Sequence, residues 1–354
     1  WKTVLSAGAG AVILAGALTA AYGYERESLE QYWADYQEFQ DFAEEYDNEE
    51  VIRLGLEMLN RGRYSRILEK NPLEQAEIFY RVGDASFNLE NYGDAQRYFF
   101  YAREAAPEEP SYYRDEAIAA ARGGNLEIAE QVMAEAEAAG MDDANLLLVR
   151  GEIALADGRE QEAAGYAGQL LEAGGDLSLR ASFLGAEACG RMGDAEGQER
   201  FLRAASGASP SGNWARKLGV AWLTMAENSG SKAKKQEYLR LAGDCYAALE
   251  ASGVLSFEDR LNQAILLEQQ GDTEAAVRIL ESLSRQERED YRVYLHLTYL
   301  YYQSEMEKGE EERNFSDMEK AYKKALELYR REGQPEDPAM SQLEQLMNNG
   351  GNSL

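Results

Sequence analysis

The sequence predicts an all-α protein, a row of about seven antiparallel helix pairs preceded by one transmembrane helix. Good helix formers dominate the chain, which holds only 6 prolines in 354 residues. Small and large apolar residues recur with a period of about 34 positions in most of the chain. One stretch near the start carries no charge. We therefore expect five parts. They are a cytoplasmic stub (residues 1–3), a transmembrane helix (4–24), an acidic aromatic helix with a capping hairpin (25–75), a repeat array (76–333), and a terminal helix with a disordered tail (334–354).

The segment from Val4 to Tyr24 contains no charged side chain, and its length matches the roughly 20 apolar residues that a helix needs to cross a bilayer. Lys2 precedes it and acids dominate the residues after it, so the positive-inside rule places the start in the cytoplasm and the rest outside. The sequence thus predicts a single-pass protein of a bacterial cell envelope with an extracytoplasmic array. Two alternatives stay open: a cleaved signal peptide, with small residues at positions 17–23, and a buried helix of a soluble domain.

The acidic stretch after this segment carries aromatic residues at helical spacing. Tyr32, Tyr36, Phe39 and Phe42 recur three or four positions apart, which is typical of a helix with one buried stripe. The residues between this helix and the array are apolar enough for a further helix. We therefore expect a hairpin that caps the first repeat.

The repeat is clearest in residues 76–109. Its regularly spaced small and large residues are Phe79, Val82, Gly83, Tyr92, Ala95, Phe99, Ala102 and Pro107. Residues 110–143 and 144–177 continue the pattern without a gap, and later units follow with a one-residue slip and two insertions, the second near 304–313. The pattern resembles the tetratricopeptide repeat (TPR), with Ser86 where that family has a tyrosine.

The resemblance implies a right-handed superhelix whose concave groove is lined by the first helix of each pair. The residues that it places in the groove, and that we predict to bind a peptide, are Tyr80, Asp84, Phe87, Arg114, Glu152, Tyr299 and Tyr302. An aromatic and acidic lining suits a basic or mixed apolar protein segment. The alternative is that these positions only face solvent. The Lys and Asn that clamp carboxylates in one branch of the family are absent at Tyr80 and Asp84.

The composition excludes several classes of function. A net charge of −28 opposes binding to phosphate backbones, so we expect no nucleic-acid partner. The single histidine, His296, lies in an aromatic-rich segment, and Cys189 and Cys245 are interpreted as buried thiols. We find no nucleophile–base set, no metal-ligand spacing and no phosphate-binding loop. The sequence therefore predicts neither an enzyme nor a cofactor.

Together these features predict a membrane-tethered, extracytoplasmic repeat scaffold that binds a protein or peptide. The layout is similar to the C-terminal span-plus-repeat region of bacterial membrane-anchored serine/threonine kinases, which implies the sensor part of a larger receptor kinase. Kinase motifs do not occur in these residues, so a kinase domain would lie upstream of Trp1. The alternative is a secreted or periplasmic TPR assembly factor released by signal cleavage. The sequence leaves the oligomeric state open.

Overall fold

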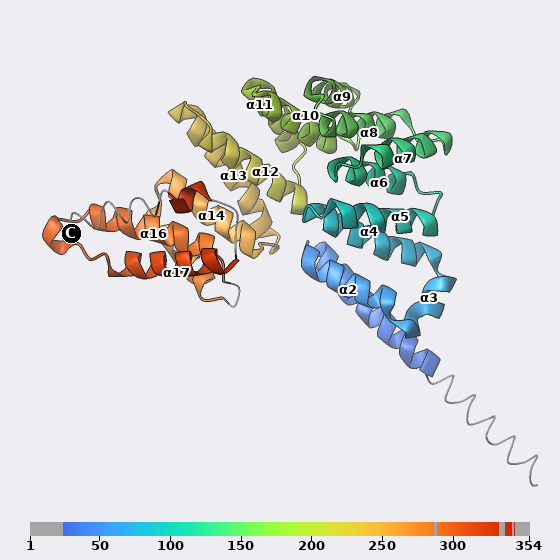
Figure 1. The fold of residues 1–354 in the computed structure, drawn as a ribbon, viewed down its shortest axis with the longest axis horizontal. Helices are drawn as coiled ribbons and strands as arrows, with labels where there is room; N and C mark the ends of the chain where they lie inside the picture. Colours follow the sequence, from blue (N-terminus) through green and yellow to red (C-terminus); the bar gives the residue numbers. More distant parts are fainter. Residues whose placement is uncertain (1–23, 287–288, 333–336, 342, 344–354) are drawn as a thin grey trace, which may run out of the picture. The chain divides into compact units, whose positions relative to one another are not determined.

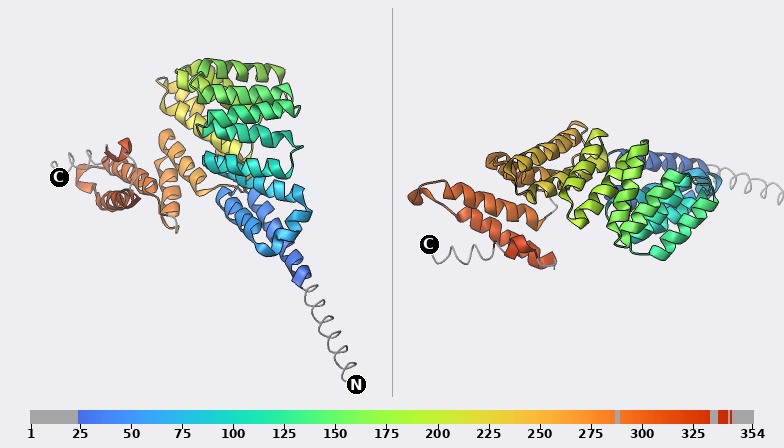
Figure 2. Two further views of the ribbon diagram at one scale, coloured as in Figure 1. Left: turned by 45° about the vertical axis from the view of Figure 1, so that its right-hand side comes forward. Right: turned by 90° about the horizontal axis from the view of Figure 1, so that it is seen from above.

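The computed structural model describes residues 24–286, 289–332, 337–341 and 343, which form helices and turns without a strand (Figure 1). The chain divides into two compact units, the first ending at Asn213 and the second beginning at Trp214. Within each unit, consecutive helices pack against one another as antiparallel neighbours, which the two further views in Figure 2 also show. This stacking confirms the predicted all-α row of helix pairs.

The first unit begins with helical residues 24–44. Its further helices are α2 (Asn48–Asn60), η1 (Gly62–Tyr64), α3 (Ser65–Lys70), α4 (Pro72–Asn88), α5 (Tyr92–Ala105), α6 (Pro110–Arg122), α7 (Leu126–Ala138), α8 (Asp143–Ala156), α9 (Glu160–Ala173), α10 (Ser178–Met192) and α11 (Ala195–Gly207). From α4 onward the even-numbered helices are the first helices of their pairs.

The second unit contains the later repeats. Its helices are α12 (Gly212–Glu227), whose first turn crosses the unit boundary, α13 (Lys232–Ala251), α14 (Phe257–Gln270), α15 (Thr273–Ser284), α16 (Tyr291–Met306), η2 (Glu310–Glu312) and α17 (Ser316–Glu332). The first predicted insertion, residues 228–236, is partly helical, because α13 begins at Lys232. The second contains the short 3-10 helix η2. Residues 338–341 are helical again.

The turns inside the helix pairs follow from local sequence. Gly124 and Gly193 adopt the left-handed conformation, with φ of 80° and 74°, which costs glycine little. In the pair α4–α5 the same position is Glu90, with φ of 61°. Asn125 and Asp194, the next residues, accept hydrogen bonds from the first turns of α7 and α11 and so cap those helices.

Close packing of the pairs depends on small residues at fixed places. A Cβ atom at Gly185 of α10 would lie 2.4 Å from a ring carbon of Phe201 on α11, so only glycine fits there. Ala163 and Ala205, on the second helices of their pairs, are fully buried. The division into small residues at close contacts and large residues between them is therefore confirmed.

The aromatic stripe of residues 24–44 is buried against the first repeats. Tyr32 and Phe39 are almost fully buried, and Tyr36 is 8% exposed. The hydroxyls of Tyr32 and Tyr36 donate hydrogen bonds to Glu74 and Glu77 of α4, at 3.0 and 2.9 Å. The stripe thus joins the first helix to the array through both apolar and polar contacts.

The predicted localisation, a single-pass membrane protein with its array outside, is overturned. Within the described ranges, none of the helices combines the length and the apolar character that crossing a bilayer requires. The physical reason is amphipathicity: α13 has 20 residues, but charged side chains such as Lys235, Arg240 and Asp244 run along it. Of the predicted span 4–24, only Tyr24 belongs to the described residues.

Candidate functional site

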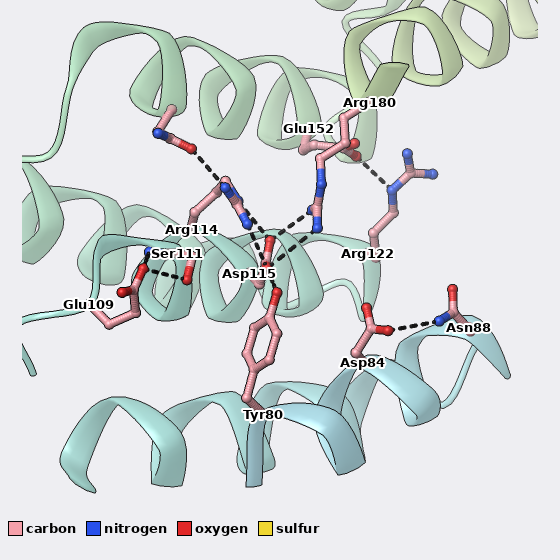
Figure 3. Close-up of polar contacts among 11 residues, drawn as sticks. Tyr80, Asp84, Asn88, Glu109, Ser111, Arg114, Asp115, Arg122, Glu152 and Arg180 are labelled. Atoms are coloured by element: carbon pink, nitrogen blue, oxygen red, sulfur yellow. Dashed lines mark hydrogen bonds and ion pairs between the residues drawn. The ribbon is translucent and has the colours of Figure 1, made fainter. Parts of the chain in front are cut away.

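A polar network lies on the first helices of the pairs in the first unit, with Asp115 of α6 at its centre (Figure 3). Asp115 is 4% exposed. Its carboxylate accepts hydrogen bonds from Nε of Arg114, from a guanidinium nitrogen of Arg180 on α10 and from the hydroxyl of Tyr80 on α4, each at 2.8 Å. Arg114 also donates to the side-chain oxygen of Asn145 on α8, at 3.0 Å. Side chains from three first helices therefore meet at one carboxylate, and Arg114 links Asn145 of a fourth helix to the same network.

The electrostatics of this cluster keep Asp115 ionised. Burial alone would raise its pKa, but the charges of Arg180 and Arg114 outweigh burial and lower the pKa to about 2. The pKa of Tyr80 is raised, first by burial and then by the charge of Asp115. Tyr80 therefore stays protonated and acts as a hydrogen-bond donor over the physiological range.

A second group of ion pairs continues the network. Nε of Arg122 on α6 lies 2.6 Å from Glu152 of α8, and the same guanidinium pairs with Glu187 of α10. Glu187 also pairs with Arg191, at 2.7 Å. Burial opposes the charge of Arg122, yet Glu152 and Glu187 raise its pKa above the usual value. The side chain is therefore a permanent cation held between two acids.

The two groups link helices that are not neighbours in the row. Asp115–Arg180 and Arg122–Glu187 each join α6 to α10, across α8. We call the surface formed by α4, α6, α8 and α10 the inner face. The carboxylates of this network, those of Asp115, Glu152 and Glu187, are paired with the guanidiniums of Arg114, Arg122, Arg180 and Arg191.

The neighbour of Asp115 has a different environment. Glu116 is 2% exposed and lies 2.7 Å from Nε of Arg103 on α5, without an aligned hydrogen bond between the two atoms. Arg103 also donates to Glu135 of α7, at 2.6 Å. Burial raises the pKa of Glu116 to about 7, because one guanidinium shared by two acids does not offset the desolvation.

The structure places the predicted groove residues of the first unit on this inner face. Tyr80, Arg114 and Glu152 are members of the network. Asp84 accepts a hydrogen bond from the amide of Asn88, at 3.2 Å. The ring of Phe87 lies edge-on to that of Tyr92, with centroids 5.2 Å apart. These residues share one surface, and their role in peptide binding remains a prediction.

In the second unit the predicted residues make aromatic contacts. Tyr299 donates a hydrogen bond to the carbonyl of Ala339, at 3.3 Å, and packs near Met340 and Leu295. Burial, followed by the charge of Glu268, raises the pKa of Tyr299. The ring of Tyr302 stacks on that of Phe315, with centroids 6.1 Å apart. Their role in peptide binding also remains a prediction.

Sequence reasoning missed the charged residues that tie the inner face together. Asp115, Arg122, Arg180 and Glu187 lie one position beyond or before the positions that the family pattern assigns to the groove. A signal was present, because two acids stand directly before the buried alanine-rich run of α6 and Arg122 stands directly after it.

Other reactive side chains are in ordinary surroundings. Nδ1 of His296 lies 2.7 Å from a carboxylate oxygen of Glu268. Burial raises the pKa of Cys189, and it raises that of Cys245 to about 11, so both thiols are held in the protonated form. The described ranges contain no group of His, Cys, Asp and Glu that could hold a metal ion.

Comparison with known proteins gives matches among solved structures. No protein-family model matches the sequence, and no curated protein matches it. Human IFIT1, as a dimer with PPP-AAAA, is 16% identical with a TM-score of 0.47, covering 86% of this chain and 69% of that one. A tetratricopeptide repeat protein from Parabacteroides merdae is 13% identical with a TM-score of 0.36, covering 72% and 93%.

A third similar structure is PilW, a type IV pilus biogenesis factor, at 14% identity and a TM-score of 0.41, covering 62% of this chain and 96% of that one. These similarities do not test the predicted kinase-like layout. The repeat type rests on the residues of this chain, namely the regular spacing, the small residues at close helix contacts and the stacked helix pairs. With those features each unit is a row of stacked helix pairs, whose repeat is similar to the tetratricopeptide repeat.

Proposed function

We propose that this chain is a non-catalytic scaffold that binds a protein or peptide on the inner face of its first unit. The observation that most directly supports this proposal is a hydrogen-bonded network on the inner face. It brings together side chains from four first helices, namely Tyr80, Asp115, Asn145 and Arg180. Such a network supplies donors and acceptors at fixed spacing, which is what sequence-selective recognition of an extended chain requires. Tyr299 and Tyr302 on α16 are proposed as contact residues of the second unit.

The charges favour a partner that carries both signs. The carboxylates of the network are already paired with guanidiniums, so an incoming segment binds by exchanging partners with existing ion pairs. The net charge of −28 acts at longer range and favours the approach of a basic protein. A segment with both basic and acidic side chains, flanked by apolar residues, satisfies both requirements.

The proposal is tested by selecting peptides from a random display library on the full chain. We expect enriched sequences of mixed charge, whose Kd is then measured by fluorescence anisotropy. The double variant Asp84→Ala with Asn145→Ala removes two half-buried polar groups of the inner face and should weaken binding about tenfold or more. Arg97→Ala, an exposed change on α5, is the control and should leave the Kd unchanged.

Two results would reject the proposal. One is a selection that enriches no peptide above a library panned without the protein. The other is a set of enriched peptides that bind the inner-face double variant and the wild type equally well, because the binding surface would then lie elsewhere.

A further inference from the structure

Residues 24–60 form a helix pair in the same register as α4–α5. Phe39 of the first helix lies against Gly55 of α2, where an added Cβ atom would lie 2.9 Å from a carbon of the Phe39 ring. In α4–α5 the two residue types are exchanged at the same spacing along the chain, because Gly83 lies against the ring of Phe99, with 2.8 Å for the corresponding distance. The first pair therefore aligns with α4–α5 when Phe39 is matched to Gly83.

This alignment extends the inner face to the first helix. It matches Trp33 to Glu77 and Tyr36 to Tyr80. The contacts agree, because Tyr36 donates a hydrogen bond to Glu77 on α4, at 2.9 Å, and Tyr80 donates one to Asp115 on α6, at 2.8 Å (Figure 3). The ring of Trp33 contacts that of Tyr36, with centroids 5.8 Å apart. Trp33 is therefore at a position that belongs to the same surface as the network.

Trp33 is a large apolar side chain that the fold leaves exposed. It is 47% exposed, whereas Tyr32 and Tyr36, the two rings that it touches, are buried. Both contacts are nearly perpendicular, at 76° and 90°. Leu29, one helical turn earlier, is 44% exposed. Tryptophan is enriched among the residues that dominate binding energy, so this indole is a candidate anchor for a partner.

Acids outnumber bases beside this ring. The carboxylates of Glu74 and Glu77 accept the hydroxyl hydrogen bonds of Tyr32 and Tyr36, the two rings in contact with Trp33. Arg81 supplies one cation, 3.7 Å from Glu77. The helix at residues 24–44 itself carries seven acids and one base. An incoming positive charge therefore meets a net negative surface next to an exposed indole.

We propose that Trp33, together with Glu74 and Glu77, is a subsite for an arginine side chain of the bound segment. The inference rests on the function proposed above, because it names one side chain of that partner. A guanidinium stacks on an indole face by cation–π attraction, and its charge complements the two carboxylates. Its alkyl stem covers apolar ring surface at the same time. The partner is therefore a segment that places a basic residue over the first helix.

The experiment uses peptides selected on the full chain from a random display library. Glu74→Gln with Glu77→Gln removes two charges, while the amide oxygens still accept the tyrosine hydroxyls. Glu27→Gln with Glu38→Gln is the matched control, because it removes two exposed charges roughly 120–140° around the first helix from Trp33. Replacing the arginine of a selected peptide by citrulline, its uncharged analogue, should raise the Kd about tenfold for the wild type and the control, and less than twofold for the subsite variant.

The aromatic part of the subsite is tested separately. Trp33→Ala should raise the Kd of the arginine peptide about tenfold, Trp33→Phe should restore part of the loss, and Tyr101→Ala, which removes a 41% exposed ring on α5, should leave it unchanged. In chain labelled with 5-fluorotryptophan, the fluorine-19 resonance of Trp33, assigned with Trp33→Phe, should shift when the arginine peptide is added. Thermal unfolding of each variant shows that a weaker Kd does not reflect loss of the fold.

The outcomes separate the subsite from the proposed function. Peptides that bind the double variant Asp84→Ala with Asn145→Ala weakly, but bind Trp33→Ala and the Gln variant as well as the wild type, would leave the proposed function in place and overturn the subsite. An unmoved Trp33 resonance at saturating peptide would overturn it too. If no peptide is enriched at all, the proposed function and the subsite fail together.

Discussion

The contacts that hold the first helices of the helix pairs differ between the two units. In the first unit, buried ion pairs centred on Asp115 and Arg122 tie α6 to α8 and α10. In the second, Tyr291 and Tyr299 of α16 bond to residues 337 and 339, and Met340 fills the apolar space beside them. The second unit also has ion pairs between first helices, Arg216 of α12 with Asp259 of α14 and Arg292 of α16 with Glu258 of α14, but these join neighbours in the row. The comparison is therefore between ion pairs that reach from α6 past α8 to α10 in the first unit and aromatic and apolar packing beside α16 in the second.

The largest expected effect comes from removing the central carboxylate of the charged surface. Asp115→Ala leaves Arg114 and Arg180 buried without their shared acid, so the free energy of unfolding should fall by about 3–5 kcal/mol. Urea unfolding followed by circular dichroism measures it. Asp94→Ala, which breaks an exposed pair on α5, is the control and should change little. A loss below about 1 kcal/mol for Asp115→Ala would mean that the pairs do not hold the surface.

The apolar surface should respond to lost packing instead. Met340 is 1% exposed in a cluster with Leu295, Ala325 and Leu343. Met340→Ala should destabilise the second unit by about 2–5 kcal/mol, since it deletes buried atoms and leaves a cavity. Hydrogen exchange of α16 and α17 reports this locally. If Met340→Ala also accelerated hydrogen exchange in α6 and α10, the claim that the two surfaces are stabilised independently would be wrong.

The pH dependence of stability gives a further test within the first unit, because the pKa of Glu116, the neighbour of Asp115, is raised. For Glu116 the folded pKa of about 7 lies above the ordinary 4.5, so its contribution to stability is complete below pH 4.5 and is lost as pH rises to 7. Glu116→Gln should flatten the slope of unfolding free energy between those pH values. A slope identical to that of the wild type would contradict this assignment.

Asp115 has the opposite sign. Its folded pKa of about 2 lies below the ordinary 3.8, so its contribution is present above pH 3.8 and is lost as pH falls toward 2. Acid unfolding of the wild type should therefore steepen in that range, and Asp115→Asn should remove the steepening. An unchanged acid transition in Asp115→Asn would show that other carboxylates dominate it.

The smallest expected effect is the loss of one hydrogen bond in the second unit. Tyr291 donates to Asp337 at 2.8 Å, next to the helical residues that begin at 338. Tyr291→Phe keeps the ring and should cost about 0.5–1.5 kcal/mol of unfolding free energy. Thermal unfolding detects it as a lower Tm. A larger loss would mean that the hydroxyl organises more of this surface than its hydrogen bond to Asp337 suggests.

The repeat architecture could be predicted because it depends on local spacing. Gly185 and Ala205 recur where helices must approach, and Gly124 marks a turn, whatever the rest of the chain does. The groove residues were predicted as a surface from the same spacing. The ion pairs between α6 and α10 could not be predicted in this way. They depend on the rotation between successive helix pairs, which is a property of the whole unit.

The predicted localisation failed for a different reason. It rested on one uncharged stretch, residues 4–24, whereas the helices of the described residues owe their length to amphipathic packing and carry charges throughout. The packing of Tyr46 on Gly212 could not be predicted either, because the two residues are far apart in the sequence and neither belongs to a motif. Contacts between distant residues leave no local pattern.

The central claim is that the inner face of the first unit is the binding surface. Hydrogen–deuterium exchange of the full chain, with and without a saturating peptide from the display selection, tests it most directly. The account predicts slower exchange in α4, α6, α8 and α10, which carry the network, and little change in α5, α7 and α9. Protection confined to α5, α7 and α9 would contradict it, because the peptide would then bind the opposite side of the helix pairs.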